Sequence, residues 1–313
     1  MSVKKARGQG RADKMVFVSG AGAYNKYLEA EHLGRCKMRP FFLAILLLQV
    51  PSPDPSPVAS PVTSPVTSKD QRVEYVISQL AQNGFTRQEA ESFFQDPRLK
   101  PYPPREVAPR TIDWDQVIAQ LVRSASVQQG REFLSQHGAT LQVAETESGV
   151  PREVLVGIFR MESNFGKNAG NYVVFNVFYS FLVDSEQERR WRWAADNLVS
   201  LINFCKATGS DCYQFRGSYA GAMGPAQFLP RSVELYGKDG NGDTVVNPFV
   251  MEDAIFSTAH FLVEHGWHQD HHAALGKYYG SANGYPRAIL AYAEALRLKQ
   301  PDSASTPRVL KMN

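Results

Sequence analysis

Apolar residues recur at helical spacing along most of this chain, and the strict alternation that marks strands is nearly absent. Residues 71–82, for example, carry Val73, Val76, Ile77 and Leu80 on one helical face. Further helices are predicted in a short segment capped by Thr86 and Glu89, at 114–122, over 131–146, and in a longer segment capped by Ser185 and Glu188. The sequence therefore predicts a mainly α-helical fold with little β structure.

Composition sets the size and class of the protein. Of the 313 residues, 43% are hydrophobic and 21% are charged, which is enough to bury at least one full core. The formal net charge is only +3. Because nucleic-acid-binding domains are usually much more basic, we expect no nucleic-acid partner.

The N-terminal region carries a candidate export signal. Basic residues precede the apolar run at 41–48, which is too short to span a bilayer as a helix. We interpret 38–50 as a signal peptide or anchor, with Met38 as the true initiator and 1–37 as an upstream extension or mis-annotated start. A buried helix remains the alternative. Export predicts a periplasmic or cell-envelope location, with a membrane anchor near the N-terminus as one form of it.

The next segments divide the chain further. Residues 51–69 are rich in Pro, Ser and Thr, a composition that favours an extended spacer without a core. We predict an N-terminal helical region at 70–146, a second and larger domain at 147–300, and a disordered tail at 301–313.

Glu162 stands out within the larger domain. Val154, Leu155, Ile158 and Met161 form a helical pattern that stops at this acid, and a Gly-containing turn follows. A carboxyl group held at the mouth of a cleft is partly desolvated and keeps its proton more readily, as a general acid must. The same stretch alone also fits a solvated residue in a last helical turn.

Cysteine and histidine patterns are less specific. Cys205 and Cys212 enclose a short loop and could form a local disulfide in an exported protein, or remain two ordinary thiols. Five of the seven histidines lie within 260–272, but their spacing does not match a helical zinc motif. We expect a polar helix end and loop there.

The acidic loop at 239–253 is a candidate calcium site. Asp239, Asn241 and Asp243 stand at alternate positions, as in the first half of a calcium-binding loop. The second half departs from that pattern, so Glu252 or Asp253 would have to complete a structural Ca²⁺ site, with the Val245 carbonyl as a further ligand. A polar turn is the alternative.

Four motifs occur in order between Val150 and Trp267. They are Met161-Glu-Ser163, the segment Gly217-Ser-Tyr-Ala-Gly-Ala-Met-Gly-Pro-Ala-Gln-Phe-Leu-Pro230, Asp253-Ala-Ile255 after the acidic loop, and His265-Gly-Trp267. Together they resemble the lytic murein transglycosylase B family. The resemblance implies a lysozyme-like catalytic domain at 147–300, preceded by a small helical extension. It also implies cleavage of the β-1,4 bond between N-acetylmuramic acid and N-acetylglucosamine in peptidoglycan, without a catalytic cofactor.

The resemblance also implies roles for individual residues. The glutamate that matches Glu162 is the sole acid and base, and the product is a 1,6-anhydromuramoyl end. From these motifs and the nearby aromatic residues we expect substrate contacts at Ser163, Tyr179, Ser218, Met223, Gln227, Phe228 and Tyr278. The chain departs from the family where Tyr279 replaces an asparagine. Asp184, Asp196 and Glu264 remain candidates for a second acid.

Two other functions fit the same residues. A goose-type hydrolytic lysozyme would share the fold and the single glutamate, and a non-catalytic peptidoglycan-binding module would share the surface. For each, the expected partners are peptidoglycan glycan strands, and cell-wall synthesis or remodelling enzymes are further candidates. We expect a monomer.

Overall fold

The computed structural model describes residues 68–103, 111–280 and 284–298. Within them the chain forms twelve helices and two short strands. The helices are α2 (Lys69–Gln82), α3 (Arg87–Gln95), α4 (Trp114–Leu121), α5 (Ser124–Gln136), α6 (Gly138–Ser148), α7 (Arg152–Ser163), α8 (Val174–Asp184), α9 (Glu188–Thr208), α10 (Pro230–Tyr236), α11 (Met251–Glu264), α12 (His271–Tyr279) and α13 (Tyr285–Arg297). The strands are β1 (Tyr172–Val173) and β2 (Arg216–Gly217). The predicted mainly α-helical class is confirmed.

Several helix starts follow the predicted local signals. Thr86 and Glu89 form a reciprocal capping box at the start of α3, as the sequence predicts. Ser68 and Gln71 form another capping box at the start of α2, and α2 begins at Lys69, one residue before the predicted start of the folded body at residue 70. These side chains satisfy backbone N–H groups that have no partner inside the helix.

Two predictions about helix boundaries were wrong. The segment 131–146 is divided between α5 and α6, because His137 leaves the helical conformation at φ −111°. Ser185 does not cap α9, which begins at Glu188 after Gln187. The Ser185 carbonyl instead accepts a hydrogen bond from Arg72 Nη1 at 2.7 Å, so tertiary packing of α2 overrides the local motif.

Helix α7 lies at the centre of the larger body. Every residue from Val154 to Ser163 is buried. A helix that is covered on all sides must be surrounded by other elements, and α7 contacts α5, α6, α11 and α13. Its C-terminal residues are therefore held rigidly from several directions.

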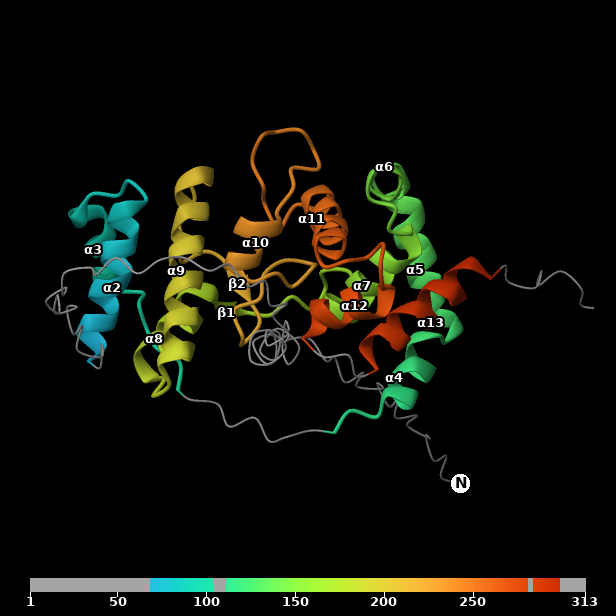
Figure 1. The fold of residues 1–313 in the computed structure, drawn as a ribbon, viewed down its shortest axis with the longest axis horizontal. Helices are drawn as coiled ribbons and strands as arrows, with labels where there is room; N and C mark the ends of the chain where they lie inside the picture. Colours follow the sequence, from blue (N-terminus) through green and yellow to red (C-terminus); the bar gives the residue numbers. More distant parts are fainter. Residues whose placement is uncertain (1–67, 104–110, 281–283, 299–313) are drawn as a thin grey trace, which may run out of the picture.

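The helices before α7 pack at two separate places (Figure 1). Helices α2 and α3 lie at one end of the molecule, where α2 packs against α8 and α9. Helices α4 to α6 lie at the other end, where they contact α7, α11 and α13. The region 70–146 thus contributes to both ends of one hydrophobic core.

Strands β1 and β2 join the turn after α7 to the segment that contains the glycine-rich motif. They pair antiparallel, with Tyr172 opposite Gly217 and Val173 opposite Arg216. Nearby, Cys205 and Cys212 form a disulfide at the C-terminal end of α9. Of the two states left open by the sequence, the structure has the paired one.

The predictions for both ends of the chain fall outside the described residues. At the N-terminus these are the segments 1–37 and 38–50 and the spacer up to residue 67, and at the C-terminus the tail at 301–313. Within the described ranges, no helix combines the length and apolar character needed to cross a membrane.

Candidate active site

Glu162 occupies the last turn of α7 and is only 5% exposed. The helix ends in an unusual run of left-handed residues: Asn164 at φ 51°, Phe165 at φ 61° and Gly166 at φ 81°. A left-handed phenylalanine is uncommon and needs support from its surroundings. Phe133 of α5 supplies it by stacking on Phe165 at a centroid distance of 4.9 Å. The chain therefore turns sharply just after the acid.

Tyr285 is the partner of this acid. Its Oη atom donates a hydrogen bond of 2.8 Å to Glu162 Oε1, and both side chains are buried. Burial raises the pKa of Tyr285 well above its ordinary value, and the nearby Glu162 charge raises it further. The phenol therefore stays protonated and can donate to the carboxylate at neutral pH.

Sequence reasoning missed Tyr285. It is the first residue of α13, between Gly284 and Pro286, where the Gly-Tyr-Pro sequence indicates only a helix start. Nothing local distinguishes this tyrosine from a core aromatic residue, because its contact with Glu162 depends on how α13 packs along α7.

Tyr278 and Tyr279 of α12 complete a group of tyrosines near the acid. Tyr278 is fully buried and donates a 2.7 Å hydrogen bond to the Ala226 carbonyl. Burial, and secondarily the charge of Glu162, raises the pKa of both Tyr278 and Tyr279. The structure thus brings Tyr278 close to Glu162 and uses its hydroxyl to hold the 217–228 segment, and the substrate contact expected for Tyr278 stays a prediction.

Ser163 also joins the acid to that segment. It is fully buried, donates from Oγ to the Pro225 carbonyl at 2.7 Å, and accepts from the Gly166 N–H at 2.8 Å. Its hydroxyl therefore fixes the turn after α7, and the substrate contact expected for Ser163 stays a prediction.

The segment 217–228 folds back on itself as a compact turn. The N–H of Met223 donates to the Phe228 carbonyl at 2.7 Å, and the N–H of Phe228 donates back to Met223 at 3.1 Å. Ser218 Oγ accepts from the N–H groups of Ala220 and Ala222. These bonds place Ser218 at only 6% exposure and define the shape of the turn.

Three further residues of the expected substrate-binding set pack into the core in this structure. Met223 is fully buried and Phe228 is 3% exposed, because the turn points both side chains into the core. Phe228 packs against the rings of Phe261 and Tyr278. Tyr179 is half-buried on α8, where its ring contacts Phe94 of α3. These three residues serve packing in the structure.

Gln227 is 1% exposed and left-handed, at φ 52°. Its Nε2 donates to the carbonyls of Ala169 and Gly224, whereas its buried Oε1 has no hydrogen-bond partner among the residues that the structure describes. The side chain therefore joins the loop after α7 to the glycine-rich turn. It was predicted as a substrate contact, and its position supports a structural role.

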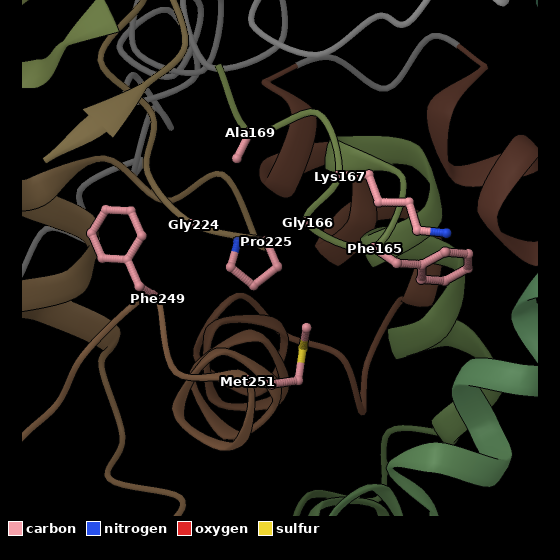
Figure 2. Close-up of a pocket in the computed structure, with 8 residues that line it drawn as sticks. All are labelled: Phe165, Gly166, Lys167, Ala169, Gly224, Pro225, Phe249 and Met251. Carbon is pink, nitrogen blue, oxygen red and sulfur yellow. The ribbon is translucent and has the colours of Figure 1, made fainter. Parts of the chain in front are cut away.

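A cavity of about 390 Å³ lies between these two loops and the start of α11. Figure 2 shows Phe165, Pro225, Phe249 and Met251 around it, with the Lys167 side chain extending outward. Its lining is mostly apolar, and Lys167 is its charged residue. The loop after α7 and the 217–228 turn, which hold Glu162, thus also form this cavity.

The candidate second acids have partners of their own. Asp184 pairs with Lys69 at 3.2 Å, and Glu264 lies 3.5 Å from His260. Burial raises the pKa of Asp196, against the opposing effect of Arg231. None of these contacts assigns a catalytic role to the three residues.

The acidic loop at 239–253 is closed by backbone hydrogen bonds. Asp239 accepts from Gly242 and Thr244, Asn241 accepts from Asp243, and Asp243 accepts from Val245. Asp253 is fully buried and accepts from Gly240 and Asn247. Across the described ranges, no three Asp, Glu, His or Cys side chains converge as metal ligands. The predicted calcium ligands therefore share a loop but do not form a cage in this structure.

Comparison with known proteins agrees with this architecture. Membrane-bound lytic murein transglycosylase B from Escherichia coli strain K12 is 29% identical over 175 residues, covering 55% of this chain and 48% of that protein. The chain thus spans about half the length of the curated relative it matches.

Solved structures share the fold. Lytic transglycosylase Slt35 from Escherichia coli, in complex with calcium, has a TM-score of 0.61 at 20% identity and covers 72% of this chain and 92% of that one. SltB3 from Pseudomonas aeruginosa, in complex with NAG-anhNAM-pentapeptide, has a TM-score of 0.56 at 26% identity and covers 64% of this chain and 54% of that one. The predicted lysozyme-like helical fold is confirmed.

The family match covers both the helical extension and most of the larger body. Residues 68–281 match the family model described as Transglycosylase SLT domain. This range includes Glu162, the 217–228 turn and the acidic loop, and it exceeds half of the chain. The chain therefore belongs to the Transglycosylase SLT domain family.

Proposed function

We propose that this protein is a peptidoglycan lytic transglycosylase. It would cleave the β-1,4 bond between N-acetylmuramic acid and N-acetylglucosamine and leave a 1,6-anhydromuramoyl end. The observation that carries the proposal is the buried Glu162 carboxyl group, held by Tyr285 at the end of the central helix in a chain of this family. Names of the relatives that include murein and NAG-anhNAM support the choice of substrate.

Glu162 would act twice in one turnover. As an acid it donates its proton to the glycosidic oxygen, and the leaving sugar departs as an alcohol while the bond to the anomeric carbon breaks. As a carboxylate it then takes the proton from the C6 hydroxyl of the muramic acid residue, whose oxygen forms the new bond to the anomeric carbon. The proton returns to Glu162, so no water is consumed and the enzyme is regenerated.

Tyr285 suits both steps. Because it remains protonated, it donates to the carboxylate form of Glu162 and stabilises the charge left after the first proton transfer. A second enzymic carboxylate is not required if the substrate's own N-acetyl group stabilises the positive charge at the anomeric carbon, as in substrate-assisted glycosidases.

Product analysis tests the proposal. Purified peptidoglycan is digested in isotope-labelled water with the wild-type protein, the Glu162→Gln variant, and a Glu147→Gln control on the exposed face of α6. We expect anhydro ends without label from the wild type and the control, and no cleavage by Glu162→Gln. Labelled reducing ends would instead identify a goose-type hydrolytic lysozyme, and binding without cleavage by the wild type would identify a wall-binding module.

We infer export to the cell envelope. The segment 38–50 supports it as a signal peptide or anchor, and the Cys205–Cys212 disulfide fits an oxidising compartment. The relative from Escherichia coli is named as membrane-bound. In this scheme residues 147–300 form the catalytic domain behind a 51–69 spacer. A reporter fusion with and without residues 38–50 tests it, because cytoplasmic reporter activity in both forms would exclude export.

We also propose that calcium binds the acidic loop. The oxygen donors of Asp239, Asn241, Asp243 and Asp253 suit this hard cation, and Slt35 was solved with calcium. A carboxylate that accepts one or two backbone hydrogen bonds, as these do, retains lone pairs for an ion, but the ligands would have to draw together. Thermal melting with calcium and with chelator tests this: an unchanged midpoint in wild type at millimolar calcium counts against a site, and Asp243→Asn should remove any shift.

A further inference from the structure

Trp114 lies outside the segments that resemble the catalytic motifs, yet it reaches the tyrosines around Glu162. It is the first residue of α4, directly after Asp113, which caps the helix by accepting from the Gln116 N–H at 3.0 Å. Because the helix start is fixed in this way, the half-buried indole ring has a defined position on the core.

The indole contacts two tyrosines edge to face. Its ring centroid lies 5.7 Å from Tyr279 at an interplanar angle of 84°, and 6.5 Å from Tyr285 at 88°. Tyr279 in turn stacks on Tyr285, with centroids 4.8 Å apart and planes within 11°. Aromatic pairs in these geometries are favourable beyond the area that they bury. Three rings from α4, α12 and α13 thus form one aromatic group, which we name the Trp114 group.

Gly284 shows how closely the indole approaches the start of α13. A Cβ atom built on Gly284 would lie 2.1 Å from Trp114 Cγ, and the residue has φ +72°. Only glycine tolerates both the left-handed backbone and this contact. The ring therefore fills the space directly beside the residue that precedes Tyr285.

The Trp114 group determines where the Tyr285 hydroxyl points. The Tyr285 ring packs against both Trp114 and Tyr279, and its Oη atom lies 2.8 Å from Glu162 Oε1. The stacking needs the aromatic side chain that this chain has at position 279. Because the Tyr285 ring packs against two other rings, its hydroxyl has little freedom to move.

We propose that Trp114 is a positioning residue of the active site, which acts through Tyr279 and Tyr285 to fix the carboxyl group of Glu162. This inference rests on the proposed function, since it assigns a helix before the catalytic domain to the same reaction. Trp114 does not exchange a proton. It restricts the donor that orients the acid, and small displacements of such groups have large effects on rate.

The test is a double-mutant cycle on full-length protein. Trp114→Ala should lower kcat roughly tenfold or more with KM changed less than about threefold, because the orientation of the acid and not substrate binding is affected. Trp114→Phe, which keeps an aromatic edge, should recover most of the rate. In a Tyr285→Phe background, Trp114→Ala should have little further effect, because the hydroxyl that it positions is gone.

The pH profile separates positioning from a merely structural role. Loss of a well-placed donor disfavours the carboxylate form of Glu162, which must start the reaction protonated, so the alkaline limb of the kcat profile should move to higher pH in Trp114→Ala and in Tyr285→Phe alike. Asp115→Asn is the matched control. It removes the ion pair with Arg287 that joins α4 to α13, and it leaves the three rings in place. It should leave kcat and the pH profile unchanged.

Each outcome decides one of the two proposals. Full activity of folded Trp114→Ala, or additive losses in the double mutant, would overturn the positioning role while Glu162-dependent cleavage by the wild type still stands. If Trp114→Ala does not fold, the Trp114→Phe and Trp114→Leu pair provides the same comparison. Absence of cleavage by the wild type would refute the proposed function itself.

Discussion

The Oη atom of Tyr285 donates a 2.8 Å hydrogen bond to Glu162 Oε1, joining two buried residues that are 123 positions apart in sequence. The contact joins the start of α13 to the end of α7, two helices that pack along each other in the larger body. It makes the state of the acid dependent on a phenol that stays neutral. The predictions below follow from this contact and from the loops that surround it.

Tyr285→Phe removes the donor and keeps the ring. A hydrogen bond to a charged group contributes about 1.5–3 kcal/mol, so we expect kcat to fall by roughly ten- to a hundredfold if that stabilisation is present at the transition state. Steady-state kinetics on purified peptidoglycan measures the change. KM should change little, because the hydroxyl faces the acid.

Tyr292→Phe is the control for this substitution. Tyr292 lies on the same helix and donates a 2.7 Å hydrogen bond to the Ser126 carbonyl. Its loss should lower the melting temperature and leave kcat unchanged. Equal losses of activity in both variants would mean that α13 stability, and not the Glu162 contact, controls the rate.

The sequence was sufficient to predict Glu162 but not its surroundings. The helix that carries the acid is encoded locally, by apolar spacing that ends at a glycine-containing turn. Tyr285 and Trp114 could not be found in this way, because their roles arise when α13 and α4 pack near α7 and α12. Tertiary packing carries that information, and no short window of sequence contains it.

The same reason explains why the sequence did not predict which way the side chains of the 217–228 segment point. Small residues in 217–228 correctly indicated close backbone approach, but the direction of each side chain depended on the paired hydrogen bonds between Met223 and Phe228. These bonds turn both side chains inward. A pattern of small and polar residues predicts a tight turn, whereas its inner and outer faces are set by long-range contacts such as that between Tyr278 and Ala226.

Gly224→Ala should damage this turn. Gly224 has φ +66°, and an added Cβ would lie 2.0 Å from the Pro248 carbonyl oxygen, which belongs to backbone and cannot move aside cheaply. We expect a loss of more than about 2 kcal/mol in the free energy of unfolding.

Gly242→Ala is the matched control, since Gly242 has φ +80° with nothing within 4 Å of the added atom. Its cost should be near 1 kcal/mol, from backbone strain alone. Equal losses by chemical denaturation would show that crowding at Pro248 contributes nothing.

The Cys205–Cys212 disulfide should stabilise the end of α9. It closes a loop with a sequence separation of only 7, for which the chain-entropy relation gives about 2.5 kcal/mol. Reductant should therefore lower the melting temperature of the wild type. A double serine variant should melt at the reduced wild-type temperature and show no response to reductant, and a reductant effect in that variant would point to another cause.

Arg98 should make stability dependent on acid pH. Its side-chain hydrogen bonds are the main cause of the lowered pKa values of Asp96 and Asp211. Since both carboxyl groups hold protons less readily when folded, the unfolded chain takes up protons first as pH falls. The contribution is therefore complete above the ordinary carboxyl pKa of about 4 and disappears as pH falls through the lowered pKa values.

Arg98→Gln should reduce the melting temperature at pH 6 and flatten its decline toward pH 3. Because Arg98 and Asp211 are about half exposed and Asp96 is partly exposed, high salt should weaken the difference between the two proteins. Parallel melting curves across this pH range would exclude Arg98 as the cause.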